Sequence, residues 1–241
     1  MSQKKIGALV KTSLVDFPGR VCATVFLKGC NLRCPYCYNH SLVMGKDEED
    51  FVTFDQVIEH LKKRQNVLSG FVISGGEALL NPDLPGLIRA AKELGYKIKL
   101  DTNGTNPGQL SFIINDPTTK PDFIAMDLKT SFDRYVEFNP KGCKMTAPEY
   151  REALVHSIQI IKEYPKDSYE FRTVLVPTLV TKHEITELSN YIPKDADWYF
   201  AQFINENCQD PLLNNLPPYT DAEIEDLVAH AKQFIPNAKF R

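Results

Sequence analysis

Three cysteines lie within eight residues of one another, at a spacing that suits metal ligation. Cys30, Cys34 and Cys37 are separated by three and by two residues, so their thiolates can wrap one face of a metal centre. Structural zinc normally takes four ligands, usually as two separated pairs, and no second Cys-x-x-Cys or His pair occurs in the sequence. A [4Fe–4S] cubane held by three cysteines keeps one iron without a protein ligand. The spacing therefore favours an iron–sulfur cluster with one open iron.

Two other interpretations of these thiols stay open at this point. One is a loop of ordinary thiols, and the other is a zinc site completed by the nearby His40. The remaining cysteines, Cys22, Cys143 and Cys208, are scattered along the chain. We expect them to be buried or surface thiols, since cysteines outside metal sites are often buried.

Composition places the chain among ordinary globular proteins. Its 241 residues carry a net charge of −3, with 43% hydrophobic and 24% charged residues, which suits one α/β domain. No apolar run approaches the roughly 20 residues that span a bilayer, and no basic tract offers a nucleic-acid footprint. We therefore expect a cytoplasmic protein with neither a membrane nor a nucleic acid as partner.

Short apolar runs alternate with amphipathic windows along the chain. The runs are bounded by Gly, Pro, Asn or Asp, as buried parallel strands are. Predicted strands cover Val21–Leu27, Phe71–Ser74, Lys97–Asp101, Phe123–Asp127, Glu170–Val176 and Trp198–Phe203. Predicted helices cover Thr53–Lys63, Pro82–Leu94, Ala147–Tyr164, His183–Tyr191 and Thr220–Phe234, the first and last opening with capping boxes.

Six strand–helix units imply right-handed crossovers and a parallel sheet, fewer than the eight that close a full barrel. We therefore predict a partial (β/α)6 TIM-like barrel in a single domain covering 1–241, with a core of about 16–204 and a C-terminal extension over 205–241. Polar motifs follow four of the strands. They are the cysteine loop, Gly75-Gly76-Glu77, Asp101-Thr102-Asn103-Gly104 and Asp127-Leu128-Lys129. A site at the carboxyl ends of the strands would collect all four.

The cysteine loop resembles the signature of the radical S-adenosylmethionine (SAM) superfamily, Cys-x-x-x-Cys-x-aromatic-Cys, with Tyr36 as the aromatic residue. The resemblance implies that SAM binds the open iron and is cleaved by an electron from the cluster to methionine and a 5′-deoxyadenosyl radical. It also implies that Tyr36 lies near the adenine, where a flat π-face is suitable.

The other motifs resemble SAM-binding elements of the same superfamily. Gly75 and Gly76 would permit close backbone approach, and Glu77 would pair with the SAM ammonium. The resemblance implies ribose contacts for Asp101 and Asn103, a carboxylate-side contact for Lys129, and an Arg172 that points toward SAM. It further implies a monovalent cation site at Asp101 and Asp127. Two positions depart from the usual pattern, Ala78 in place of Pro and Tyr38 in place of His.

The N-terminal segment Gly7–Gly19 resembles the opening of enzymes that activate glycyl radical enzymes, with Asp16 expected at the mouth of the barrel. Within that branch the chain is most similar to activating proteins of anaerobic ribonucleoside-triphosphate reductase. The implied reaction is hydrogen abstraction from a glycine Cα of a partner protein, with a flavodoxin- or ferredoxin-type electron donor. Activation of pyruvate formate-lyase, a radical SAM reaction on a small molecule, and an iron–sulfur carrier without SAM chemistry are the alternatives.

Overall fold

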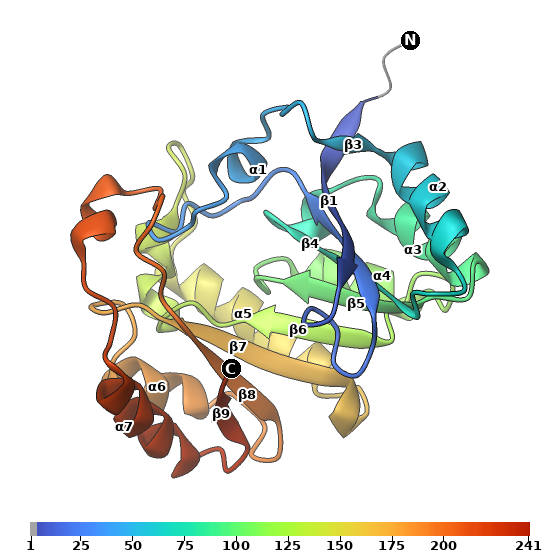
Figure 1. Cartoon of the computed structure of the whole chain (residues 1–241). Coiled ribbons are helices and arrows are strands. Elements are labelled where there is room, and N and C mark those ends of the chain that lie inside the picture. The colour runs from blue at the N-terminus through green and yellow to red at the C-terminus, as the bar shows by residue number, and fades with distance from the viewer. Residues whose placement is uncertain (1–3) are drawn as a thin grey trace. The chain divides into compact units, whose positions relative to one another are not determined.

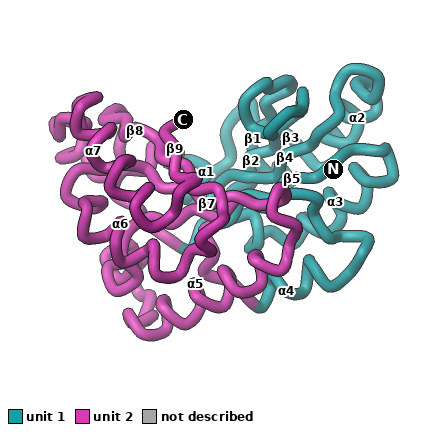
Figure 2. The backbone as a smooth tube through the Cα atoms, turned by 90° about the horizontal axis from the view of Figure 1, so that it is seen from below, with its two compact units in different colours: residues 1–31, 39–102, 108–124 teal, residues 32–38, 103–107, 125–241 magenta. Residues whose placement is uncertain are grey.

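The computed structural model describes residues 4–241, which divide into two compact units (Figure 2). Among the described residues, unit 1 comprises 4–31, 39–102 and 108–124, and unit 2 comprises 32–38, 103–107 and 125–241. Figure 1 labels the elements. Each unit has its own strands, helices and buried side chains.

Unit 1 is built on strands in the order β3-β1-β2-β4-β5. These are β1 (Lys5–Ser13), β2 (Cys22–Leu27), β3 (Val52–Thr53), β4 (Gly70–Gly75) and β5 (Lys97–Thr102). β2, β4 and β5 pair in parallel, and Leu27 stands beside Gly75 in the register. β1 pairs antiparallel with both β2 and β3. The parallel strands therefore end together at the cysteine loop and the Gly-Gly-Glu motif.

The helices of unit 1 are α1 (His40–Met44), α2 (Phe54–Arg64), η1 (Ala78–Leu80), α3 (Leu84–Glu93) and α4 (Pro107–Asn115). The expected capping box of α2 is present, with Thr53 and Gln56 bonded reciprocally. α3 buries Leu84, Leu87, Ile88 and Ala91 at helical spacing, which gives it an apolar face toward the core. Buried positions on both faces of β4, Phe71 to Ile73, are typical of a covered parallel strand.

In unit 2 the strand order is β6-β7-β8-β9, with β6 (Phe123–Asp127) leading in from unit 1. β7 (Tyr169–Leu175), β8 (Asp197–Gln202) and β9 (Ala238–Phe240) pair in parallel. Its helices are η2 (Phe132–Phe138), α5 (Ala147–Ile161), η3 (Lys166–Ser168), α6 (Lys182–Ser189), η4 (Pro211–Asn215) and α7 (Asp221–Lys232). α6 and α7 lie side by side (Figure 1).

Aromatic side chains fill much of the core of unit 2. The Tyr135 ring lies 5.8 Å from that of Phe138 and 5.6 Å from that of Tyr150. Trp198 is fully buried, and its indole N–H donates to Thr173 Oγ1 at 3.0 Å. Because the indole N–H of Trp198 has an acceptor, unit 2 buries this large side chain without the cost of an unpaired hydrogen-bond donor.

The expected α/β class with parallel strands is confirmed. All six predicted strands form, each within one residue of its expected ends, and all five predicted helices form within three residues. β1, β3, β9, α1 and α4 are additions. No helix among residues 4–241 is long and apolar enough to cross a membrane.

The expected position of Asp16 was wrong. Ser13 at the end of β1 pairs with Cys22, the first residue of β2. Thr24, also in the first half of β2, donates its hydroxyl to Asp16 Oδ2 at 2.7 Å. Asp16 therefore belongs to the amino end of β2, whereas the cysteine loop leaves the carboxyl end. The antiparallel strand β1, which was not predicted, carries the N-terminal segment back along β2 to that end.

Candidate active site

Residues 32–38 of the cysteine loop belong to unit 2 and are held by main-chain hydrogen bonds. The N–H of Cys37 donates to Cys34 O at 3.0 Å and closes a tight turn, while Arg33 N donates to Phe138 O at 2.7 Å. Cys34 is buried and Cys37 is half-buried. The loop therefore has a defined backbone before any ligand is bound.

In unit 1, Cys30 lies against the second glycine of the Gly-Gly-Glu motif. A Cβ placed on Gly76 would come 2.1 Å from Gly29 O and 3.1 Å from Cys30 Cβ. The adjacent Glu77 N–H donates to Gly29 O at 2.8 Å. Gly75 has φ +126°, and a Cβ there would meet Leu27 O at 2.2 Å. Both glycines are thus required by the close approach of neighbouring backbone within unit 1.

Glu77 is buried, with 1% of its surface exposed. Its Oε1 accepts hydrogen bonds from the Thr102 hydroxyl at 2.8 Å and from Leu79 N at 3.1 Å. These neutral donors fix the orientation of the carboxylate, and a buried carboxylate is a suitable partner for a cation. Unit 1 therefore brings together Cys30, Gly75, Gly76 and Glu77.

Asp101 and Asn103, the two residues predicted to contact the ribose, both make contacts with other protein groups. Asp101 Oδ1 lies 2.6 Å from Lys99 Nζ, and Lys99 is itself buried. Asn103 in unit 2 uses its side-chain carbonyl to accept from Thr105 N at 3.0 Å and from the Thr105 hydroxyl at 2.6 Å. This turn stiffens the backbone at the end of the Asp-Thr-Asn-Gly motif.

Asp127, Lys129 and Arg172 form one charged group in unit 2. Arg172 Nε lies 2.8 Å from Asp127 Oδ1, and Lys129 Nζ lies 3.5 Å from Asp127 Oδ2. In addition, Leu128 N donates to Arg172 O at 2.8 Å. β7 and the turn after β6 are thereby tied together, as their neighbouring positions in the sheet allow. Both acidic residues of the predicted cation site, Asp101 and Asp127, therefore contact protein cations in this structure.

The pKa of Lys129 is set by opposing effects. Burial lowers the pKa of its ammonium, but Tyr36, Asp127 and Cys34 act in the other direction, and the net pKa lies well above the usual range. Burial raises the pKa of the Tyr36 phenol, whose ring meets Phe138 edge-on at 6.3 Å. Lys129 is therefore a permanent cation at neutral pH beside a neutral phenol.

Sequence reasoning missed three residues that support this group of side chains. Thr102 orients Glu77, and the Tyr135 phenol oxygen accepts the N–H of Lys129 at 2.9 Å. The main-chain N–H of Gln209 donates to the main-chain oxygen of Cys37 at 2.8 Å. Thr102 belongs to the Asp101-Thr102-Asn103-Gly104 motif but had no predicted role of its own. Tyr135 lies on an aromatic helix that is typical of a core, and Gln209 lies far along the chain. Only the folded chain could reveal them.

The side chains of each unit suit an iron–sulfur cluster and a zwitterionic cofactor by their chemistry. Unit 1 has the thiol of Cys30 and the buried carboxylate of Glu77, and unit 2 has the thiols of Cys34 and Cys37 and the ammonium of Lys129. Gln209 Oε1 is buried and has no hydrogen-bond partner among residues 4–241, so an acceptor beside the cysteine loop suits a ligand that carries N–H donors. Within the same described range, no group of three or more His, Cys, Asp or Glu side chains is placed to hold a metal ion.

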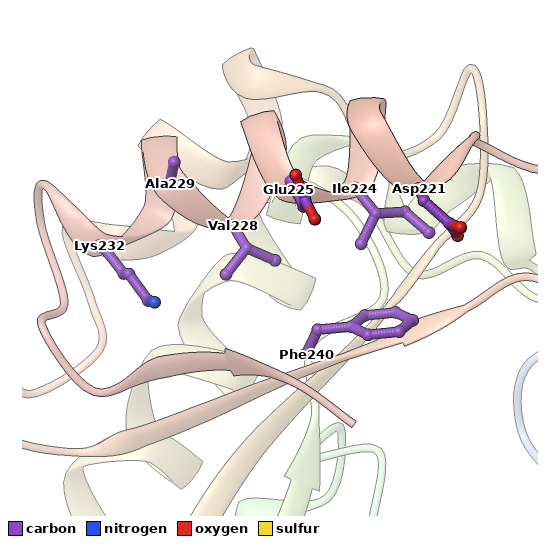
Figure 3. A pocket seen from close by; sticks show the side chains of 7 residues that line it. All are labelled: Asp221, Ile224, Glu225, Val228, Ala229, Lys232 and Phe240. Carbon is purple, nitrogen blue, oxygen red and sulfur yellow. The ribbon is translucent and has the colours of Figure 1, made fainter.

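A groove of about 490 Å³ in unit 2 is separate from these residues (Figure 3). It lies between α7 and β9 and is lined by Asp221, Ile224, Glu225, Val228, Ala229, Lys232 and Phe240. Its lining contains no thiol and none of the predicted site residues.

The chain belongs to the radical SAM superfamily, whose family pattern matches residues 24–191. This family uses a [4Fe–4S] cluster and SAM. Among solved structures, SuiB of Streptococcus suis bound to its precursor peptide SuiA has a TM-score of 0.58 at 16% identity, over 90% of this chain and 47% of that one. This likeness shows the fold, a partial (β/α)6 TIM-like barrel.

Curated relatives narrow the class further. A protein of Methanocaldococcus jannaschii provisionally named a glycyl-radical enzyme activating enzyme is 30% identical over 238 residues, 98% of this chain and 95% of that protein. The pyruvate formate-lyase-activating enzyme of Clostridium pasteurianum is 30% identical over 202 residues, 80% of this chain and 77% of that enzyme. The chain is thus a radical SAM enzyme of the glycyl-radical-enzyme activating type.

Proposed function

We propose that this enzyme abstracts a hydrogen atom from one glycine Cα of anaerobic ribonucleoside-triphosphate reductase. The observation that carries the activating reaction is the similarity over nearly the full length of an activating-enzyme relative. The choice of the reductase is supported by the N-terminal segment Gly7–Gly19, which resembles the opening of reductase activating proteins. We propose a single domain over residues 1–241, a cytoplasmic location, and a flavodoxin- or ferredoxin-type electron donor.

In this proposal Cys30, Cys34 and Cys37 would hold the cluster, and the reduced cluster would supply one electron for the cleavage of SAM to methionine and a 5′-deoxyadenosyl radical. Glu77 provides the buried negative charge for the SAM ammonium, and Lys129 provides the positive charge for its carboxylate side. Gly75 and Gly76 allow the backbone to approach closely.

The rest of the chain's proposed task is to orient the nucleoside. Tyr36 offers its ring to the adenine, and Asp101 and Asn103 contact the ribose. Arg172 lies 2.8 Å from Asp127 and keeps the turn before Lys129 in place. A monovalent cation at Asp101 and Asp127 remains a prediction. It would have to compete with Lys99, Lys129 and Arg172 for the carboxylates.

Pyruvate formate-lyase is the second candidate partner, favoured by the 30% identity to a pyruvate formate-lyase-activating enzyme. Anaerobic reconstitution followed by reduction with dithionite in the presence of SAM tests the chemistry, and 5′-deoxyadenosine is the expected product. Each partner is then added separately, and the glycyl radical is counted by electron paramagnetic resonance. A radical on the formate-lyase alone would reassign the partner. Turnover of a free metabolite without either protein would favour a small-molecule enzyme.

A further inference from the structure

The segment 203–219 of unit 2, between β8 and α7, is ordered by its own contacts (orange-red in Figure 1). Cys208 N donates to Asn214 Oδ1 at 2.8 Å, and Leu212 N donates to Asp210 Oδ1 at 3.0 Å. The Tyr219 hydroxyl donates to Val180 O at 3.0 Å and anchors the far end. The segment is therefore a fixed surface of unit 2 that follows the carboxyl end of β8.

This segment is bonded directly to the cysteine loop. Gln209 N donates to Cys37 O and Asp210 N donates to Pro35 O, each at 2.8 Å. Two adjacent main-chain bonds hold the segment and the loop in one register, as in a short two-stranded pairing. The segment 203–219 is therefore attached directly to the loop that carries the third cysteine.

Large apolar side chains are exposed on both bonded segments. Leu212 is 78% exposed and Ile204 is 57% exposed, and Tyr38, next to Cys37, is 60% exposed. Single exposed apolar residues are normal on a protein surface. Here three of them lie on two segments that hydrogen bonds join, and exposed apolar side chains on joined segments are candidates for an interaction site.

Charge restricts what this surface can bind. Glu206 and Asp210 are the only charged residues between positions 203 and 219, and the segment has no Lys or Arg. An apolar surface with acidic residues complements a segment that is apolar and basic, and it repels an acidic protein such as an acidic electron donor.

We propose that the segment 203–219, together with Tyr38, is the docking surface for the glycine-bearing segment of the partner glycyl radical enzyme, which should present apolar and basic side chains there. This inference rests on the proposed function, because it assumes a protein substrate. It adds where that substrate binds and with which chemistry. The two main-chain bonds attach this docking surface directly to the loop that carries Cys37.

The test compares Leu212→Ser with Val67→Ser in the complete reconstituted enzyme. Val67, 54% exposed, lies between α2 and β4 of unit 1 and serves as the matched control. We expect Leu212→Ser to weaken binding of the partner by about tenfold, as loss of an apolar interface anchor does, and to lower the yield of glycyl radical. Partner-free cleavage of SAM with dithionite should be unchanged in both variants.

A second variant, Glu206→Lys, tests the charge. It should weaken binding of the partner most at low salt and leave reduction by an acidic donor unimpaired. Partner binding at wild-type strength in both Leu212→Ser and Glu206→Lys would overturn the docking surface, and so would equal weakening by Val67→Ser. Loss of partner-free cleavage in Leu212→Ser would assign the segment to support of the cluster instead. If the wild-type enzyme cleaves SAM but forms no radical on either partner, the proposed function fails and the docking proposal falls with it.

Discussion

The phenol oxygen of Tyr135 accepts the main-chain N–H of Lys129 at 2.9 Å. Tyr135 is fully buried in the aromatic core of unit 2, so a core side chain fixes the backbone of the residue proposed to face the SAM carboxylate. Because η2 is packed in the core, this hydrogen bond fixes the main-chain position of Lys129.

Replacing Tyr135 with Phe should therefore affect both stability and binding of SAM. It leaves the partly buried N–H of Lys129 without this acceptor, which costs about 1 kcal/mol in free energy of unfolding. The looser turn should raise the dissociation constant of SAM by several-fold, measured by anaerobic titration calorimetry. Tyr150→Phe is the matched control, because it removes a buried phenol that donates to Asn139 Oδ1 and does not contact Lys129. Equal effects on SAM affinity from the two variants would contradict the positioning role.

The same phenol predicts how stability depends on alkaline pH. Burial raises the pKa of Tyr135 above the ordinary tyrosine value of about 10. Above that pH the unfolded chain releases the phenolic proton while the folded chain keeps it, so the free energy of unfolding falls as pH rises. Urea unfolding of the apoprotein at a series of alkaline pH values should show this decline. The decline should be shallower in Tyr135→Phe, and identical slopes would show that another group is responsible.

The sequence predicted the strands of the parallel sheet and the motifs at their ends because those depend on local patterns. β4 and β5 are apolar runs that stop at Gly75 and after Asp101, where the polar motifs begin. β1 was not predicted, because Val10, Lys11 and Thr12 are exposed and interrupt its pattern. The three-residue β9 is too short to show any period.

The supporting contacts of the site could not be predicted, because they depend on the tertiary fold. Thr102 belongs to a strand-end motif, but only its distance to Glu77 reveals its role. Gln209 lies in a segment without periodicity, and its bond to Cys37 joins distant parts of the chain. Sequence spacing identified the charged residues and thiols, and packing determined what holds them in place.

Glu77 allows a direct test of the proposed ammonium site. Glu77→Gln keeps the shape of the side chain and an oxygen for the Thr102 hydroxyl, but removes the charge. Because a hydrogen bond to a charged group is worth about 1.5–3 kcal/mol, the dissociation constant of SAM should rise about 10- to 100-fold, with the iron content unchanged. Glu170→Gln is the control, since Glu170 is equally buried, at 1% exposure, and pairs with Arg241. Wild-type SAM affinity in Glu77→Gln would assign the ammonium to another group.

Gly76 tests whether the Gly-Gly-Glu motif also shapes the cysteine loop. In Gly76→Ala the new methyl group would come 2.1 Å from Gly29 O and 3.1 Å from Cys30 Cβ. Because the first obstacle is backbone, the loop must shift, and Cys30 must move with it. We expect reconstituted Gly76→Ala to bind markedly less iron and sulfide per chain than the wild type. Gly86→Ala is the control, since its methyl group would meet only the Phe54 ring at 3.3 Å, and alanine is favoured over glycine in a helix by about 1 kcal/mol. A full iron content in Gly76→Ala would mean that the loop tolerates the displacement and that the second glycine serves the SAM site alone.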